Sequence, residues 1–401
     1  MSASTARNAF QDADVAARML TLGLPPIAGK WVFVDPTNGS DASSGLSPTT
    51  AKANIIAAHD ACTTNVGDGI AVFGQNLASS PTYCTSYLSK PFDFSKNSIT
   101  VFGVCAPTRM EQRARIEHKI AVTTSVAVVS NATAQTIVRA DGGSFITDGW
   151  IVGSTGKYDS ASSGNASRTF TLTAVTASTL TCTAADILTE ASTTRTLTSY
   201  HAALFTVSGA NNAFYNLHMT CTDTHALSLT CLKVTGVRNY FKNVHAAQGA
   251  ASAATALTRS LWLSAGEANT FEDCTFGLDT VDRGNNATYD IYISGVVKRN
   301  RFINCETIGY ASTGVAKLAV YLDGTVGGSP TRFHQCSFVC NNVTEMTAAF
   351  GANGSNDKVW CTGGTCHPGY AALGGGANVV FIHGPTASTA GVSGKLTAPA
   401  A

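Results

Sequence analysis

The chain has 401 residues, of which 13% are charged, about half of the roughly 25% typical of soluble proteins, and its formal net charge is +1. This balance gives no electrostatic basis for binding nucleic acid or an anionic membrane surface, and the apolar windows are too short to span a bilayer. Glycine, with 37 residues, and Ala, Ser, Thr and Asn take the place of the missing charged residues. This composition indicates a rigid β protein with many turns, and we expect no cofactor.

Residues 1–30 are expected to form a separate N-terminal segment. Residues 8–22 have the apolar spacing of a short amphipathic helix. Such a helix is either a cap that shields the end of a repeat structure or an anchor to another subunit, and the sequence favours neither. Because Asp12 and Asp14 stand where a signal peptide would carry a basic region, we expect synthesis in the cytosol without an export signal.

The next segment, residues 31–76, predicts two strands separated by a turn and a helix. The first strand ends at Asp35 and a turn covers residues 38–44. Ser-Pro then starts a helix that runs to about Cys62. A Gly-Asp-Gly turn leads into the second strand, residues 70–73.

Two less regular stretches follow. Residues 92–153 are interpreted as further coils of a repeat, with residues 98–105 and 144–153 as the clearest strands. Residues 157–199 are rich in Ser and Thr, and we interpret them as an inserted hairpin that projects from the repeat structure.

A repeat of about 30 residues dominates the second half of the chain. Its markers are five phenylalanines at spacings of 27, 30, 31 and 31 residues: Phe214, Phe241, Phe271, Phe302 and Phe333. An Asn stands two positions before Phe in the first four copies. Because side chains alternate across a strand, Asn and Phe are predicted to share the inner face, with residues such as Arg301 on the outer face.

The alternation breaks two residues after each Phe. The residue there is polar, namely Asn216, Asn243, Asp273, Asn304 and, less typically, Gln335. The residue after it is apolar or Cys and again looks like core. A sharp bend explains this change of parity, and Asn and Asp tolerate the left-handed backbone conformation that such a bend needs.

Each copy also has a strand before the Phe strand, ending at a glycine, and a third strand after the bend. Three short strands per coil predict an all-β fold, a single-stranded parallel β-helix with short N-terminal helices, in which equivalent residues stack about 4.8 Å apart. Right-handedness follows from the general preference of parallel crossovers. The β-helix is expected to cover residues 31–385.

Cysteines follow the same register. Cys274, Cys305 and Cys336 are interpreted as small core residues that stack with the phenylalanines. Cys361 and Cys366 lie in a Gly-rich stretch that we interpret as a loop, where they form a disulfide or remain as two thiols. The adjacent His367 would supply a third ligand only, so we expect no metal site.

An aromatic row is predicted on the outside of the strand that precedes each Phe strand. Trp262, Tyr292 and Tyr321 alternate there with inward-facing aliphatic residues, and Lys233 occupies the same row one coil earlier. Exposed aromatic rows fit subunit interfaces best. Binding of sugar rings is the second interpretation, and a surface ladder without function is the third.

Acidic residues give only a weak catalytic candidate. Asp279, Asp282 and Arg283 form the best local cluster, although solvated turn residues explain this stretch equally well. A glycosidase would need two carboxyls at a defined separation, and a lyase would need a base. The other residues available for such chemistry are Asp223, His225, Asp290, Glu306 and Asp323.

The opening of the β-helix resembles a known family. The residues that carry the resemblance are Val34-Asp35, Asn38-Gly39-Ser40-Asp41, Gly45, Ser47-Pro48 and Gly67-Asp68. Together with the coils, this segment resembles pectin-lyase-like β-helix proteins, above all bacteriophage tailspikes and related virion surface proteins. The motifs are specific for the fold and weak for activity. Residues 386–401 lack a core pattern and are interpreted as a C-terminal arm.

The resemblance implies a structural protein of a phage virion, made in the host cytoplasm and displayed on the particle as a homotrimer that contacts other virion proteins. A capsid decoration protein or head spike is favoured over a tailspike because the chain is short. The alternatives are a polysaccharide depolymerase, lyase or glycosidase, and a non-catalytic adhesin that binds bacterial surface polysaccharide. Neither nucleic acid nor membrane is expected as a partner.

Overall fold

The computed structural model describes the chain from residue 27 to residue 387 with several gaps. The described ranges are 27–74, 84–133, 135–159, 164–166, 168–183, 185–221, 225–248, 257–283, 287–311, 318–323, 331–342, 348–352, 359–366, 370, 379–381 and 386–387. The predicted N-terminal helix, His367 and nearly all of the predicted C-terminal arm lie outside these residues. No described helix has the length and apolarity needed to cross a bilayer.

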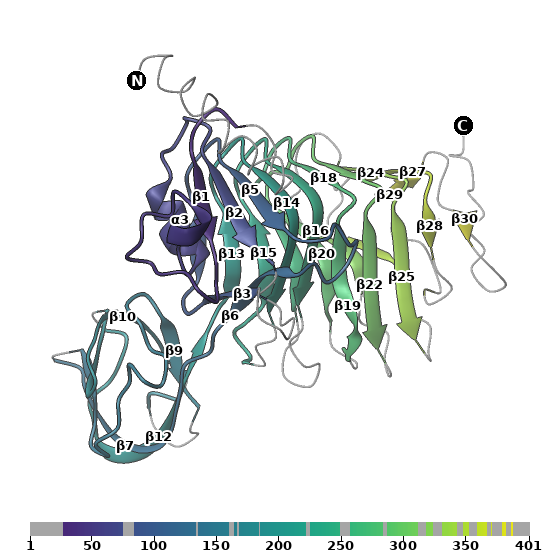
Figure 1. The fold of residues 1–401 in the computed structure, drawn as a ribbon. Coiled ribbons are helices and arrows are strands. Elements are labelled where there is room, and N and C mark those ends of the chain that lie inside the picture. The colour runs from purple at the N-terminus through teal and green to yellow at the C-terminus, as the bar shows by residue number, and fades with distance from the viewer. Residues whose placement is uncertain are drawn as a thin grey trace.

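The chain forms a right-handed parallel β-helix, as the repeat predicts. Figure 1 shows its strands side by side along one axis, with the helix α3 near the first rungs and β30 near the last. One wall, which we call sheet I, has seven strands. They are β4 (Phe92–Phe94), β13 (Ala203–Val207), β15 (Thr230–Val234), β17 (Arg259–Ser264), β20 (Tyr289–Ser294), β23 (Leu318–Asp323) and β26 (Phe350–Ala352).

A 17-stranded sheet makes the other two walls because it continues through the bend in each coil. Sheet II is the part of this sheet that precedes the bend. It contains β1 (Trp31–Val34), β2 (Gly69–Phe73), β5 (Thr100–Val104), the first parts of β14 (Ala213–Cys221) and β16 (Tyr240–Gln248), β18 (Thr270–Glu272), β21 (Arg301–Ile303), β24 (Thr331–His334), β27 (Val359–Thr362) and β29 (Val379–Phe381). Sheet III is the part of this sheet that follows the bend. It contains β3 (Cys84–Leu88), β6 (Ala114–His118), the second parts of β14 and β16, β19 (Thr275–Asp282), β22 (Glu306–Ala311), β25 (Ser337–Asn342), β28 (Thr365–Cys366) and β30 (Thr386–Ala387).

The five phenylalanines lie in one interior column of sheet II. Phe214 pairs with Phe241, and the pairing continues rung by rung to Phe333. Successive rings are parallel within 10° and their centroids lie 4.5–4.8 Å apart. Each ring is essentially inaccessible to solvent, so burial contributes roughly 1.5–3 kcal/mol per ring and stacking about 0.5–1.5 kcal/mol more.

A second interior ladder precedes the phenylalanines. The Asn269 side chain accepts from the backbone N–H of Asn239 at 2.9 Å and donates to the carbonyl of Gly236 at 3.0 Å. Asn300 repeats this pattern one rung later, toward the backbone of Asn269 and Gly266. These amides therefore satisfy the backbone groups that the Gly turns leave without a partner inside the wall.

The bend between sheets II and III has the backbone conformation that the change of parity predicts. Asn216, Asn243, Asp273 and Asn304 have φ values of 56°, 52°, 54° and 51°, and Gln335 adopts 52° as well. Gly363 continues the column at φ 66°. Only Gly, Asn and Asp enter this region readily, and for this reason the bend is visible in the sequence.

The opening segment contains two short helices where the sequence predicts one. A single 3₁₀ turn, η1 (Pro48–Thr50), is separated from α3 (Ile55–Ala61), whose first turn is capped by the Asn54 side chain. The Asp41 carboxylate accepts from the backbone N–H groups of Ala53 and Asn54 and fixes the link between them. The one-helix prediction was wrong because the acidic anchor competes with continuous helical hydrogen bonding.

The region before β13 differs most from prediction. Six strands form a closed antiparallel barrel between β6 and β13, which projects from the N-terminal end of the solenoid (Figure 1). They are β7 (Val122–Asn131), β8 (Thr136–Arg139), β9 (Thr155–Tyr158), β10 (Thr169–Val175), β11 (Thr179–Cys182) and β12 (Glu190–Tyr200). The insertion is therefore larger than the hairpin proposed for residues 157–199, and residues 144–153 form turns rather than a coil strand.

The barrel has a hydrophobic core separate from that of the solenoid. Phe145, Trp150, Tyr158 and Phe170 lie inside it together with smaller aliphatic residues. The Trp150 indole donates to Thr123 Oγ1 at 2.9 Å. Strand alternation has the same period of two in a barrel and in a solenoid coil, and therefore the sequence pattern did not separate the two.

Most of the cysteines in the described part of the solenoid are core residues, and Cys105 is partly buried. Cys274, Cys305 and Cys336 are buried thiols in one column. Cys361 and Cys366 are also thiols, and they lie in strands instead of a loop: Cys361 pairs with Phe333 and Cys366 with Phe338. The two glycines between them form the bend, so the Gly-rich stretch continues the repeat.

Candidate binding faces

Sheet I presents the aromatic row that the alternation predicts. Lys233, Trp262, Tyr292 and Tyr321 are consecutive partners on β15, β17, β20 and β23. All four are partly exposed, whereas the aliphatic residues beside them are buried. Their order follows from strand alternation, because each sits between two inward-facing residues.

Two cations cover the ring faces of this row. The Lys233 ammonium lies 4.0 Å from the Trp262 ring centroid. The Arg259 guanidinium lies 4.5 Å from Trp262 and 4.3 Å from Tyr292. Arg259 is only 8% exposed, and burial lowers its pKa. Burial, followed by the nearby Arg259 charge, lowers the pKa of Lys233. We call these side chains, with Tyr289 and Tyr321, the cation–aromatic row.

The polar ends of the rings are also engaged. Trp262 Nε1 donates to Ser294 Oγ at 2.7 Å, and the Tyr292 hydroxyl donates to the Asp323 carboxylate. Burial and then Asp323 raise the pKa of Tyr292. Tyr289 stacks on Tyr321 with a centroid distance of 4.7 Å. The rings of the row are thus held in place by contacts within the chain.

The predicted catalytic cluster does not meet on the outer surface. Arg283 is 2% exposed and lies with the buried carboxyl of Asp290 as an electrostatic neighbour. Asp279 and Asp282 remain partly exposed on β19, and Asp279 accepts from the Asn341 amide at 3.3 Å. Arg283 therefore does not share a solvent-facing site with the two carboxylates. The interpretation of this stretch as solvated turn residues was wrong, because Asp279 and Asp282 lie on a strand and Arg283 is buried.

The remaining acid and base candidates are dispersed. Glu306 pairs with Arg109 at 3.3 Å, and His225 lies 3.2 Å from the Asp159 carboxylate. Asp323 accepts from the Tyr292 hydroxyl beside the cation–aromatic row, and Asp223 lies outside the described residues. Within the described part of the chain, no three His, Cys, Asp or Glu side chains come together in a way that could hold a metal ion.

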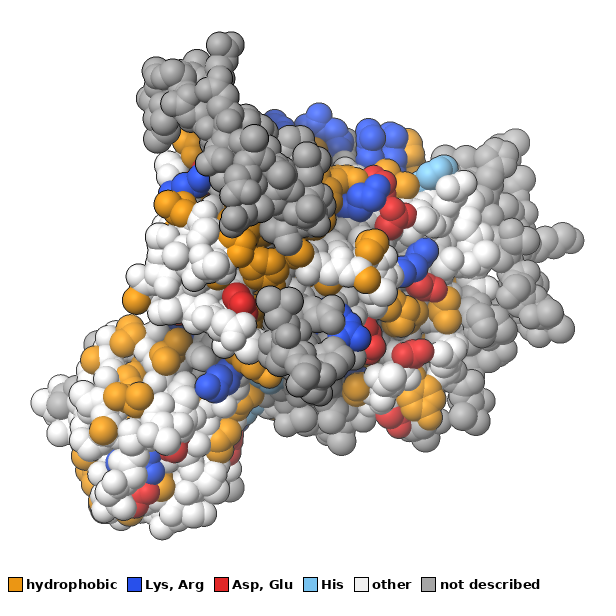
Figure 2. Space-filling model, in the orientation of Figure 1, with side chains coloured by type: hydrophobic (Ala, Val, Ile, Leu, Met, Phe, Trp, Pro, Cys, Tyr) orange, Lys and Arg blue, Asp and Glu red, His pale blue; other side chains and the backbone are white. Residues whose placement is uncertain are grey.

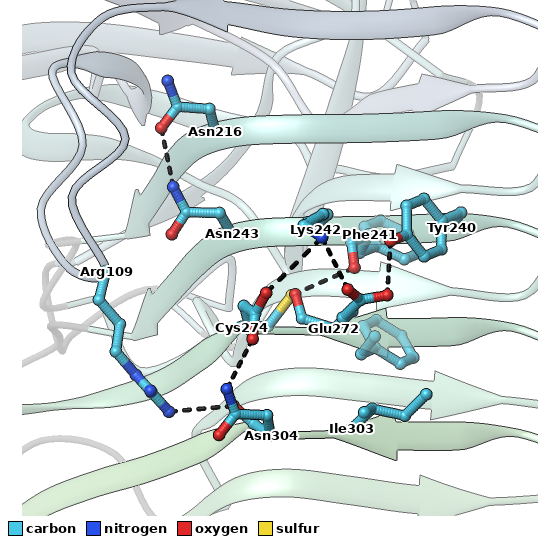
Figure 3. Close-up of polar contacts among 12 residues, drawn as sticks. Arg109, Asn216, Tyr240, Phe241, Lys242, Asn243, Glu272, Cys274, Ile303 and Asn304 are labelled. Carbon is cyan, nitrogen blue, oxygen red and sulfur yellow. Dashed lines mark hydrogen bonds and ion pairs between the residues drawn. The ribbon is translucent and has the colours of Figure 1, made fainter.

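A loop that the sequence did not single out crosses the bends of four rungs. Residues 105–113 connect β5 to β6, and their contacts run along the solenoid axis. Gln112 donates to the carbonyl of Asn243 at 2.8 Å, and the Arg109 guanidinium donates to the carbonyl of Asn304 at 3.0 Å. Figure 3 shows Arg109 reaching Asn304 beside the bend residues Asn216 and Asn243. We call this segment the strap.

Sheet II carries a polar outer face next to the strap. Lys242 pairs with Glu272 at 2.7 Å, and the Tyr240 hydroxyl donates to the same carboxylate (Figure 3). Further along the axis the face becomes basic, because Arg301 and Arg332 occupy consecutive rungs and Trp360 follows on the next. A hollow of about 320 Å³ opens between these last three residues.

Comparison with known proteins finds solved structures that are similar to this chain, but it does not assign the chain to a family. No family model and no curated protein matches the chain. A pectate lyase, Pel9A, is 14% identical over 95% of this chain and 83% of its own, with a TM-score of 0.47. Pectin methylesterase PemA from Erwinia chrysanthemi is 10% identical over 87% and 80%, with a TM-score of 0.39. The tailspike gp49 from Pseudomonas phage LKA1 is 11% identical over 81% and 68%, with a TM-score of 0.26. Because these scores are below 0.5, we infer neither activity nor partner from them, and the strand register establishes the β-helix.

Proposed function

We propose that this protein is a structural component of a bacteriophage particle, displayed on the particle surface as a trimer of parallel β-helices. The observation that carries the proposal is the cation–aromatic row on sheet I. Arg and aromatic residues are enriched at the centres of protein interfaces. Here Trp262 and Tyr292 are held in place before binding by Arg259, at 4.5 and 4.3 Å, so little side-chain entropy is lost on association.

The same geometry favours a protein partner over a sugar. A sugar ring binds by stacking on a free aromatic face. In the row, Lys233 covers Trp262, Arg259 approaches both Trp262 and Tyr292, and Tyr289 stacks on Tyr321. Parts of the Trp262, Tyr292 and Tyr321 rings remain exposed, and these suit a flat, self-complementary surface. The opening segment supports the phage assignment through its resemblance to tailspike openings.

Light scattering of the full chain tests the proposal. We expect a mass three times the 41.4 kDa of one chain and a smaller species for Trp262→Ala, because interface aromatics commonly contribute 2 kcal/mol or more. Tyr215→Ala is the matched control, since Tyr215 is a partly exposed aromatic residue on sheet II. A monomer at all concentrations, or equal effects of both substitutions, would contradict the proposal.

The rival enzymatic function has its own test. A polysaccharide depolymerase would release reducing or unsaturated sugar from capsule or lipopolysaccharide, whereas the structural protein would not. Release of such sugar by the purified full chain, abolished by Asp279→Asn or Asp282→Asn, would overturn the structural assignment. A glycan adhesin on sheet I would instead bind a glycan array and lose binding in Trp262→Ala while its mass stays unchanged.

A further inference from the structure

A second hydrophobic cluster lies on the outside of sheet II, separate from the solenoid core. Its buried and partly buried members are Trp31, Phe33, Ala51, Ala71, Ile27, Phe73, Phe102 and Val104. The strand members point away from the solenoid core because side chains alternate across a strand and Val32, Ile70 and Val101 point into it. Figure 2 shows hydrophobic side chains gathered on this side of the molecule, over the N-terminal rungs.

The cluster continues along the solenoid axis as an aromatic surface. Phe102 on β5 pairs with Tyr215 on β14, with ring centroids 6.2 Å apart, and the Tyr215 ring lies 5.7 Å from that of Tyr240 on β16. All three are only partly buried. The strands β1, β2, β5, β14 and β16 are consecutive rungs, so this surface extends about 19 Å along the axis. We call it, with Phe73 and Val104, the N-terminal face of sheet II.

The environment of Trp31 indicates what kind of group covers this face. Trp31 is 3% exposed, and its Nε1 has no hydrogen-bond acceptor in the part of the chain that the structure describes. A buried indole N–H usually has an acceptor, and an apolar surface of this extent usually marks a contact with another element. A peptide segment supplies both apolar side chains and carbonyl acceptors.

The chain carries a suitable segment directly before this face. Ile27, where the described residues begin, packs against the cluster. Gly23 and Pro25 end the helix that the sequence predicts for residues 8–22. The link from Leu22 to Ile27 spans at most about 17 Å, and the helix itself is about 22 Å long. Its length therefore matches the length of the face.

The predicted helix has one apolar stripe. Phe10, Ala13, Ala17 and Leu20 recur at positions i, i+3, i+7 and i+10. The two alanines allow the helix to approach a sheet closely, while the larger side chains stand near its ends. Val15 lies on the opposite side of the helix. The stripe therefore predicts one defined docking side.

The sequence left two roles open for this segment, a cap on the solenoid or an anchor to another subunit. Another helix already covers the core at the first rungs, because Ile55 and Ala58 of α3 are fully buried in it (Figure 1). An anchor would lead the segment away from the face against which Ile27 packs. Docking on the outside of sheet II is a third role, and it fits both observations.

We propose that residues 8–22 form a helix that lies along the solenoid axis on the N-terminal face of sheet II. Phe10 and Leu20 pack against the aromatic side chains of β5 and β14, and the helix covers an apolar surface that would otherwise bind a second protein. The contact is within one chain. It is on a different wall from the cation–aromatic row and does not depend on the trimer.

Photo-crosslinking of the full chain tests the position of the segment. The substitution Phe10→p-benzoylphenylalanine keeps an aromatic ring at the docking stripe and adds a group that crosslinks to its neighbours on illumination. Mass spectrometry is expected to find the adducts in β2, β5 or the first part of β14. Adducts in α3, in sheet I or in a second chain would overturn the proposal.

Trypsin cleavage after Arg18 in the full chain tests the strength of the contact. Phe10→Gln and Phe102→Gln are each expected to speed this cleavage about tenfold, because burial of one phenylalanine contributes at least that factor to docking. Phe10 lies outside the described strands, so its variant tests the contact even where Phe102→Gln fails to fold. Unchanged rates in both variants would overturn the proposal.

Two matched controls remove an apolar side chain elsewhere. Val15→Gln changes the opposite side of the helix, and Tyr87→Gln changes an aromatic residue of β3 that is 53% exposed. Both are expected to leave the cleavage rate within about twofold. Equal acceleration by the controls would overturn the proposal. A rate that falls as the protein concentration rises would show docking on another copy and would overturn it as well.

Discussion

Acid should unfold this β-helix in a narrow pH range because four buried histidines, namely His118, His201, His218 and His245, are held in the neutral form. His218 and His245 stack with centroids 4.5 Å apart on sheet III, and His118 lies 6.0 Å from His201 near the barrel junction. Burial lowers the pKa of His118, His201 and His245 to about 4 and that of His218 to about 2. Arg115 lowers the pKa of both stacked histidines further.

The hydrogen bond that His245 Nδ1 accepts also favours the neutral ring, whereas the bond to the Gly277 carbonyl raises the pKa of His245 and only partly offsets burial. Its Nδ1 accepts from the backbone N–H of Glu111 in the strap at 3.1 Å, which leaves Nε2 to donate to the carbonyl of Gly277 at 2.9 Å. Only the neutral ring can do both. Protonation of Nδ1 would therefore break one of the contacts that hold the strap against sheet III.

The direction and the size of the pH dependence of stability follow from the difference in proton binding between the folded and unfolded chain. In the unfolded chain each histidine binds its proton near pH 6.5, and in the folded chain only near pH 4 or below. Stability is therefore complete above pH 6.5 and declines as the pH falls toward 4. Each histidine contributes about 1.4 kcal/mol per pH unit, so four together reach about 8 kcal/mol at pH 5, comparable to the total stability of a typical domain.

Urea denaturation at half-unit pH steps from 7.5 to 4.5 measures this dependence. We expect a slope approaching about 5 kcal/mol per pH unit below pH 6 for the unaltered chain, and a slope lower by about 1.4 kcal/mol per unit for His218→Phe. Phenylalanine keeps the stacking on His245 and removes one titrating group. A midpoint that stays constant from pH 7.5 to 5, or a slope unaffected by His218→Phe, would refute the reasoning.

Three further predictions concern the repeat. Asn304→Ala is expected to lose about 1–2 kcal/mol of stability because φ is 51° there, and Asn304→Gly should lose less; equal losses in thermal denaturation would rule out backbone strain. Asn269→Ala removes the partners of two buried backbone groups and should cost about 2–5 kcal/mol in urea denaturation; a loss below 1 kcal/mol would contradict the interior ladder. Burial raises the pKa of Cys305 and Cys336, so both thiols should resist iodoacetamide until the chain unfolds, and rapid alkylation of native protein would show that the column is open.

The sequence was sufficient to predict the solenoid because each rung repeats the same physical solution. Phe271 and Phe302 share an interior column, and the bend residues Asp273 and Asn304 have a conformation that few residues adopt. The position of a residue in the repeat thus determined both its burial and its backbone conformation. Even Gln335, an atypical residue for a left-handed bend, follows the register of its neighbours.

The sequence was insufficient to predict features that depend on contacts outside the repeat. Arg283 looked like a solvated turn residue, yet it is buried near Asp290, seven positions later and on another strand. The barrel shares its alternation with the solenoid, so only its closed pairing, such as β12 with β7, distinguishes it. The basic part of the outer face of sheet II depends on Arg301, Arg332 and Trp360 standing one rung apart; their spacing was readable, but two arginines and a tryptophan do not form a recognisable motif.

The register of the stacked rungs determines which residues lie side by side on the outer faces of sheets I and II. A double-mutant cycle on Phe271 and Phe302 tests this register most directly. Their rings lie 4.7 Å apart and 9° from parallel. Measured by urea denaturation of Phe271→Leu, Phe302→Leu and the double variant, the coupling energy is predicted to be about 0.5–1.5 kcal/mol. Additivity within about 0.3 kcal/mol would contradict the shared interior column and, with it, the rows on sheets I and II.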